Sequence, residues 1–125
     1  MKIKLPILEQ SIENGNLISA ERDAVFNLDT SVYSEERWEQ HFPTLASKEG
    51  LFQYVERIQK DSVTERVKVA CMLKAIYCFI ESDEIPTYKS FAQMINLATP
   101  EYTTRMIKIL HDAFNIILNS SSVKN

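Results

Sequence analysis

The sequence predicts a mainly α fold, a small bundle of about five helices behind an irregular N-terminal segment. Three observations favour this fold class. The 125 residues include only two glycines and four prolines, too few for the frequent turns of an all-β sandwich. Apolar residues recur at helical spacing through most of the second half of the chain. Serine, threonine and proline residues also stand at several places where helices would begin.

The chain fits one domain over residues 1–125, in three parts. We expect an irregular or strand-like segment at 1–33, a helical core at 34–119 and a flexible polar tail at 120–125. In the first part, two alternating apolar and polar runs flank an Asn14-Gly15 pair, which is typical of tight turns. Because the runs are well separated, a short strand and a β-hairpin both remain open, and the hairpin need not have a two-residue turn.

Five helices are expected, over residues 34–42, 47–60, 63–80, 87–97 and 100–119. Ser34 is the expected N-cap of the first helix, which Pro43 ends. Ser62 to Glu65 matches a capping box for the third helix. That helix is apolar almost all round, which predicts a place at the centre of the bundle. Thr99 and Pro100 form a clear start for the last helix.

The sequence predicts neither an enzyme nor a cofactor or metal site. Two glycines cannot form the glycine-rich loops that hold phosphates, and His41 and His111 are far apart with no metal-binding motif around them. Cys71 and Cys78 fall in one helix, about 10 Å apart, which is too far for a disulfide. We therefore expect two buried thiols in a reducing compartment.

Charge and hydropathy predict where the protein acts. The net charge is −3 and the pI is near 5.4, so no general attraction to nucleic acid is expected. The N-terminus lacks the apolar core and cleavage site of a secretory signal. No apolar run approaches the roughly 20 residues of a membrane span. We expect a cytoplasmic protein that does not bind membranes.

Residues 87–110 offer an alternative function, because their pattern resembles a helix-turn-helix. In such a unit the second helix enters the DNA major groove, and Thr103, Thr104, Arg105 and Lys108 would contact the bases. The turn is longer than usual and contains no glycine, and the second helix offers only two basic residues. An antiparallel helix pair inside a bundle explains the same pattern.

Clustered aromatic residues favour protein binding. Trp38, Phe42, Phe52 and Tyr54 fall within seventeen residues of each other, and aromatic clusters often form binding hot spots. We predict these four side chains as partner contacts, with Phe114 and Leu118 contacting either a partner or a neighbouring subunit. The competing interpretation is that the aromatic residues cover the end of the helical bundle.

Two stretches, residues 28–58 and 73–98, resemble a known family over residues 27–119 as a whole. The chain is similar to the tail assembly chaperones of long-tailed bacteriophages that infect Gram-positive bacteria. The resemblance rests on a set of aromatic, proline, charged and aliphatic positions: Trp38, Phe42, Pro43, Phe52, Tyr54, Arg57, Ile80, Glu81, Ser82, Phe91 and Phe114. This family has no catalytic motif, so the match depends on pattern alone.

The resemblance implies a small, mainly helical protein that self-associates into a ring or spiral. Such chaperones coat the apolar helical segments of the tape measure protein until the tail tube polymerises. They act in the host cytoplasm, are absent from the mature virion, and are often also made in a longer, frameshifted form. A passive interaction module without chaperone action remains a further alternative. The number of subunits and the division of surfaces between partner and neighbour stay open.

Overall fold

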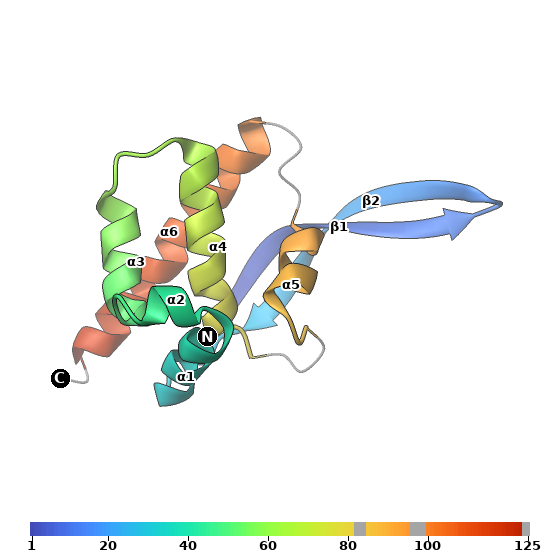
Figure 1. Ribbon diagram of the computed structural model, residues 1–125. Helices are drawn as coiled ribbons and strands as arrows, with labels where there is room; N and C mark the ends of the chain where they lie inside the picture. The colour runs from blue at the N-terminus through green and yellow to red at the C-terminus, as the bar shows by residue number, and fades with distance from the viewer. Residues whose placement is uncertain (82–84, 96–99, 124–125) are drawn as a thin grey trace.

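A long β-hairpin precedes the helices in the computed structural model, which describes residues 1–81, 85–95 and 100–123 (Figure 1). The two strands form an antiparallel sheet, and six helices follow among the described residues. The fold is therefore mixed α/β, and the predicted mainly α bundle is wrong. The difference lies in residues 2–27, which were expected to be irregular or to contain a short strand or hairpin, and which form two regular strands of twelve residues each.

Strand β1 covers Lys2–Glu13 and strand β2 covers Asn16–Asn27, with every residue of β1 opposite a residue of β2. The turn between them has two residues. Asn14 and Gly15 have φ angles of 51° and 79°, and a type I′ turn requires positive φ at both positions. Asparagine and glycine adopt this conformation at little cost, so this dipeptide fixes the register of the whole hairpin.

Among the described residues, the hairpin packs on the helical body through the half near its base. There Ile3, Leu5 and Ile7 of β1 are buried, together with Ala24 and Phe26 of β2. Isolated bridges at the base, Ile7 to Ile95 and Leu28 to Ile80, join the hairpin to the ends of two helices. The outer half extends past the helices (Figure 1).

The helices and their bounds are α1 Val32–His41, α2 Pro43–Ala46, α3 Leu51–Lys60, α4 Glu65–Phe79, α5 Tyr88–Met94 and α6 Pro100–Val123. Helix α4 packs against α1, α3, α5 and α6. Its side chains are almost all buried from Met72 to Phe79, so the prediction that this helix is central is confirmed. No helix in the described part of the chain has the length and apolarity to cross a bilayer.

Two predicted helix starts are wrong. The N-cap of α1 is Ser31, whose hydroxyl accepts the backbone N–H of Tyr33 at 3.3 Å. Ser34 lies inside the first turn, is buried, and donates its hydroxyl to the Ser31 carbonyl at 2.7 Å. Helix α4 begins after Thr64, so Ser62 does not cap it and the expected capping box is absent.

The helix predicted over 47–60 corresponds to α3, which starts only after Gly50. The short helix α2 before it was not predicted. Pro43 occupies the first position of α2, where its missing N–H costs nothing. The indole N–H of Trp38 donates to the Glu49 carbonyl at 3.0 Å, which holds the segment between the two helices. Helical periodicity does not show this link between α1 and the segment before α3.

The last two helices begin near the predicted positions. Thr87 caps α5 by accepting the N–H of Ser90 at 3.1 Å, and Pro100 is the first residue of α6. The predicted cap Thr99 and the predicted end of α5 at Leu97 lie outside the described residues. Helix α6 continues to Val123, past the point where the polar tail was expected to begin.

Candidate functional site

The predicted aromatic contacts belong largely to the core. Trp38 and Tyr54 are 1% and 2% exposed, and their rings lie 4.7 Å apart. Phe42 lies half-buried beside Trp38, with ring centroids 5.5 Å apart. The Tyr54 hydroxyl donates to the Cys71 carbonyl at 3.2 Å, and burial raises the pKa of this phenol well above its ordinary value. These three rings join α1, α3 and α4 from the inside.

The other predicted contact residues also pack inward. Phe114 is completely buried, whereas Phe52 and Leu118 are half-buried against the core. The ring of Phe52 meets that of Phe79 edge-on, with centroids 5.5 Å apart. The structure therefore brings Trp38, Phe42 and Tyr54 together, but places Phe52 and Phe114 elsewhere. Buried side chains cannot contact a partner directly, so Trp38, Tyr54 and Phe114 do not form a binding surface in this structure.

The two helices of the alternative DNA-binding unit pack mainly on other elements in the described part of the chain. Helix α5 packs on α4 and β1, whereas α6 packs on α4, α3 and β1. Among the proposed base-contacting residues, Thr103 is buried and Thr104 donates to Glu65 at 3.0 Å. Arg105 lies 3.6 Å from Glu21 of β2 and stacks on Tyr102. Much of the proposed reading surface is thus engaged within the chain.

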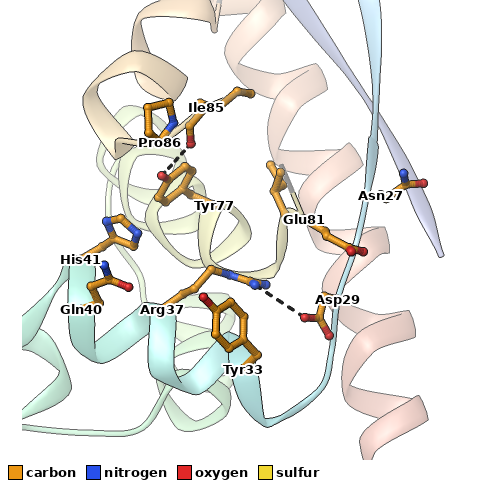
Figure 2. Close-up of a pocket in the computed structure, with 11 residues that line it drawn as sticks. Asn27, Asp29, Tyr33, Arg37, Gln40, His41, Tyr77, Glu81, Ile85 and Pro86 are labelled. Atoms are coloured by element: carbon orange, nitrogen blue, oxygen red, sulfur yellow. Dashed lines mark hydrogen bonds and ion pairs between the residues drawn. The ribbon is translucent and has the colours of Figure 1, made fainter. Parts of the chain in front are cut away.

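A polar pocket of about 620 Å³ lies between α1, the end of α4 and residues 85–86 (Figure 2). Arg37 lines it, and its Nε donates to the Cys78 carbonyl at 2.6 Å. The guanidinium also lies 3.6 Å from the Asp29 carboxylate and 5.0 Å from the ring centroid of Tyr33. A cation suits this place, because the C-terminal end of α4 is negatively polarised. Arg37 thereby joins α1 to α4 and to the end of the hairpin.

Neighbouring groups lower the pKa values of two residues in this pocket, Asp29 and His41. Hydrogen bonds from the hydroxyl and N–H of Ser31, with the Arg37 charge, hold the pKa of Asp29 below its ordinary value. Burial, with a contribution from Arg37, lowers the pKa of His41, whose ring lies edge-on to Tyr77. The Tyr77 hydroxyl donates to the Ile85 carbonyl at 2.9 Å. These hydrogen bonds and ring contacts hold α1, the end of α4 and residues 85–86 together.

One buried hydrogen-bond donor in the pocket has no acceptor in the described part of the chain. Nη2 of Arg37 is buried and has no hydrogen-bond partner among the described residues. A buried donor without an acceptor costs free energy, so an acceptor that entered the pocket would be favoured. The carboxylates of Asp29 and Glu81 line the same pocket and would repel an anion. The charges of the pocket therefore favour neither an anionic nor a cationic ligand. No cluster of His, Cys, Asp or Glu suited to a metal occurs in the described ranges.

The two cysteines lie in α4 as free thiols with different environments. Cys78 is fully buried and burial raises the pKa of its thiol to about 12, whereas Cys71 is half-buried. Because the thiolate is the reactive form, this raised pKa keeps Cys78 in its unreactive thiol form at pH 8. We expect iodoacetamide to label Cys71 of the native protein and to leave Cys78 unmodified until unfolding.

Mass spectrometry of the digested protein would measure labelling at each cysteine over time. The Cys71→Ser variant serves as the control, because its remaining thiol should stay unlabelled in buffer and react fully in denaturant. Rapid labelling of Cys78 in the native protein would show that the end of α4 opens readily, contrary to its packing.

Exposed apolar side chains also occur on the outer half of the hairpin, residues 9–20, which we call the arm. Every described side chain in the arm is exposed. Ile12 and Leu17 are 76% and 67% exposed, and they lie directly opposite each other across the strands. Ile18 is 39% exposed. Residues opposite each other point to one face of a sheet, so Ile12 and Leu17 form an apolar pair near the tip.

The sequence contained a signal for the arm that the aromatic cluster obscured. Asn14-Gly15 lies between Glu13 and Asn16, with Ile12 and Leu17 immediately beyond. A type I′ turn at this dipeptide places the two aliphatic residues opposite each other. Interpreting the flanking runs as separate segments concealed that pairing and directed attention to buried rings.

Comparison with known proteins gives no match to a family model, to a curated protein or to a solved structure.

Proposed function

We propose that the protein is a non-enzymatic tail assembly chaperone of a long-tailed bacteriophage, which binds the tape measure protein before the tail tube polymerises. The observation that carries the proposal is the arm, which exposes Ile12, Leu17 and Ile18 on a hairpin that the helical body does not cover. Exposed aliphatic side chains on a projecting element are a common basis for binding other proteins. The resemblance over residues 27–119 then gives the class of partner.

Further exposed aliphatic residues on the helical body fit the same function. Val63 and Val67, just before and within the first turn of α4, are 47% and 51% exposed, and Val32 at the start of α1 is 77% exposed. A chaperone that must release its client needs weak contacts repeated in many copies. Small scattered apolar surfaces on a self-associating subunit would satisfy that need, because the growing tube can displace contacts that are individually weak. The protein would act in the host cytoplasm and be absent from the mature virion.

Co-expression with the tape measure protein of the same phage tests the proposal. An apolar helical fragment of that protein should be insoluble alone, and should become soluble and co-purify with this chain. An unrelated helical protein of similar size and charge is the control, and should leave the fragment insoluble. Equal insolubility of the fragment with both proteins would contradict chaperone function. Salt-dependent binding to duplex DNA that is lost on changing Arg105 and Lys108 would instead favour the alternative, a helix-turn-helix DNA-binding regulator.

A further inference from the structure

The pocket between α1, the end of α4 and residues 85–86, which we call the polar pocket, holds two charged groups that the chain leaves unbonded (Figure 2). Nη2 of Arg37 is a buried donor with no acceptor among the described residues. The Glu81 side chain is exposed, and its carboxylate makes no ion pair or hydrogen bond within the same described ranges. A donor and an acceptor therefore line one pocket without bonding to each other.

The Arg37 guanidinium is fixed on one side and has a movable neighbour on the other. Its Nε donates to the Cys78 carbonyl at 2.6 Å, which sets its orientation. The Tyr33 ring lies over it, with 5.0 Å between Cζ and the ring centroid, and Tyr33 is 55% exposed. Exposed side chains change rotamer within nanoseconds, and a cation–π contact at an exposed site is weak. Rotation of Tyr33 would thus open the guanidinium to the pocket without disturbing the core.

The charges of the polar pocket favour a neutral ligand. The Asp29 carboxylate lies 3.6 Å from the Arg37 guanidinium, and hydrogen bonds from Ser31 lower its pKa and keep it ionised. The charge of Arg37 is therefore already balanced. An incoming carboxylate would be repelled by Asp29 and Glu81, and an incoming cation would be repelled by Arg37. A neutral group avoids both repulsions.

An amide group supplies the hydrogen bonds that the polar pocket lacks. Its carbonyl oxygen accepts from Nη2 of Arg37, and its N–H donates to the Glu81 carboxylate. Both bonds involve one charged partner, and such bonds are stronger than those between neutral groups. A ketone or an ether would satisfy Arg37 alone, because neither has a donor for Glu81.

The rest of the polar pocket suits a flat apolar body. Tyr77, Ile85 and Pro86 line the side that lies above Arg37 in Figure 2, together with His41. The rings of Tyr77 and His41 meet edge-on, with centroids 5.1 Å apart. Burial lowers the pKa of His41, so its ring is uncharged at neutral pH. The volume of about 620 Å³ falls within the range of roughly 300–1,000 Å³ that is usual for ligand sites.

We propose that the polar pocket binds a neutral ligand whose amide group lies between Arg37 and Glu81 and whose aromatic ring lies beside Tyr77. The amide belongs either to a free small molecule or to a short peptide, since both present the same carbonyl and N–H. This site is separate from the arm, so the inference does not depend on the chaperone function.

Three ligands of one shape and different charge test the proposal. Benzamide is neutral, benzoate is an anion and benzamidinium is a cation at neutral pH. Each is titrated into isotope-labelled protein while the backbone N–H signals are followed by NMR. Benzamide should shift the signals of His41 and Glu81 and leave that of Ile12 in the arm unchanged. Its dissociation constant should be about ten-fold lower than those of both charged analogues.

Variants of Glu81 test the acceptor without disturbing the fold. Residue 81 is exposed, and its structural hydrogen bond, to the Asn27 carbonyl at 2.9 Å, uses only the backbone N–H. Glu81→Ala should weaken benzamide binding about ten-fold, the usual effect of losing a hydrogen bond to a charged group. Glu81→Gln should narrow the difference between benzamide and benzoate. Glu39→Ala is the matched control, because Glu39 is exposed on α1 outside the pocket lining.

The donor is tested by Arg37→Gln, which should also weaken benzamide binding. Because Arg37 joins α1 to α4, this variant is used only if its circular dichroism matches the wild type, and the Glu81 variants decide otherwise. N-acetylphenylalanine amide distinguishes the two sources of the amide. Tighter binding than benzamide would assign the site to a peptide, and weaker binding would assign it to a small molecule.

Four results would overturn the proposal. Benzoate could bind at least as tightly as benzamide, which would indicate an anion site, or benzamidinium could do so, which would indicate a cation site. None of the three ligands could shift the pocket signals up to its solubility limit. Glu81→Ala could bind benzamide as well as Glu39→Ala does. These titrations do not involve the tape measure protein, so failure of the co-expression test is a separate outcome.

Discussion

Replacing Trp38 with alanine lowers the free energy of unfolding by about 3–5 kcal/mol, a large part of the stability of a domain of this size. The indole is 1% exposed, contacts the rings of Phe42 and Tyr54, and donates to the Glu49 carbonyl at 3.0 Å. Removing it leaves a cavity between α1 and α3 and takes away the donor that holds the segment before α3. Urea unfolding followed by circular dichroism measures the change.

Val32→Ala is the matched control for Trp38→Ala, because Val32 lies in the same helix and is 77% exposed. Its effect should stay within about 0.5 kcal/mol. A Trp38→Ala variant as stable as the wild type would contradict the packing of the core. It would also reopen the prediction that Trp38 contacts a partner, because a dispensable indole would then need another role.

Replacing Phe114 with alanine should cost about 3–5 kcal/mol as well, since its side chain is completely buried in α6. Ile116, two residues further along α6, is the informative comparison because it is 55% exposed. Ile116→Ala should change the free energy of unfolding by no more than about 0.5 kcal/mol.

Urea unfolding of the two variants separates the roles of Phe114 and Ile116. Phe114→Ala should shift the unfolding midpoint strongly, whereas Ile116→Ala should leave the midpoint nearly unchanged. The opposite pattern would show that the exposed side of α6 stabilises the protein and that Phe114 does not. Because both residues belong to one helix, helix propensity cannot explain a difference of several kcal/mol.

The sequence was most informative where local chemistry decides the structure. Pro100 and Thr87 mark helix starts, and the apolar character of α4 predicts its central place. The predicted N-cap of α1 was wrong because two serines near its start could serve as the cap. Ser31 rather than Ser34 begins α1, because Asp29 also accepts the N–H of Ser31 and fixes the chain before the helix. Contacts from neighbouring residues decide which serine caps the helix, and the periodicity of apolar residues carries no information about those contacts.

The strands and the candidate site were harder to predict, for a physical reason. Amphipathic patterns arise where one face is buried, and the arm has no buried face, so its sequence shows little alternation. Register there comes from Asn14 and Gly15 and from the buried base. The aromatic residues misled in the opposite way, because large rings serve cores and binding surfaces equally well. Only packing distinguishes a 1% exposed Trp38 from a hot spot.

The position of the hairpin base has a consequence for synthesis on the ribosome. The hairpin is made first, yet the buried faces of Ile3 and Leu5 belong to a core that α5 and α6 complete, and these helices are made last. Until then an isolated hairpin has little stability and its apolar face stays open to solvent. We therefore expect nascent chains that stop before α6 to be protease-sensitive in their first thirty residues, and the full-length chain to gain protection there in a single late step.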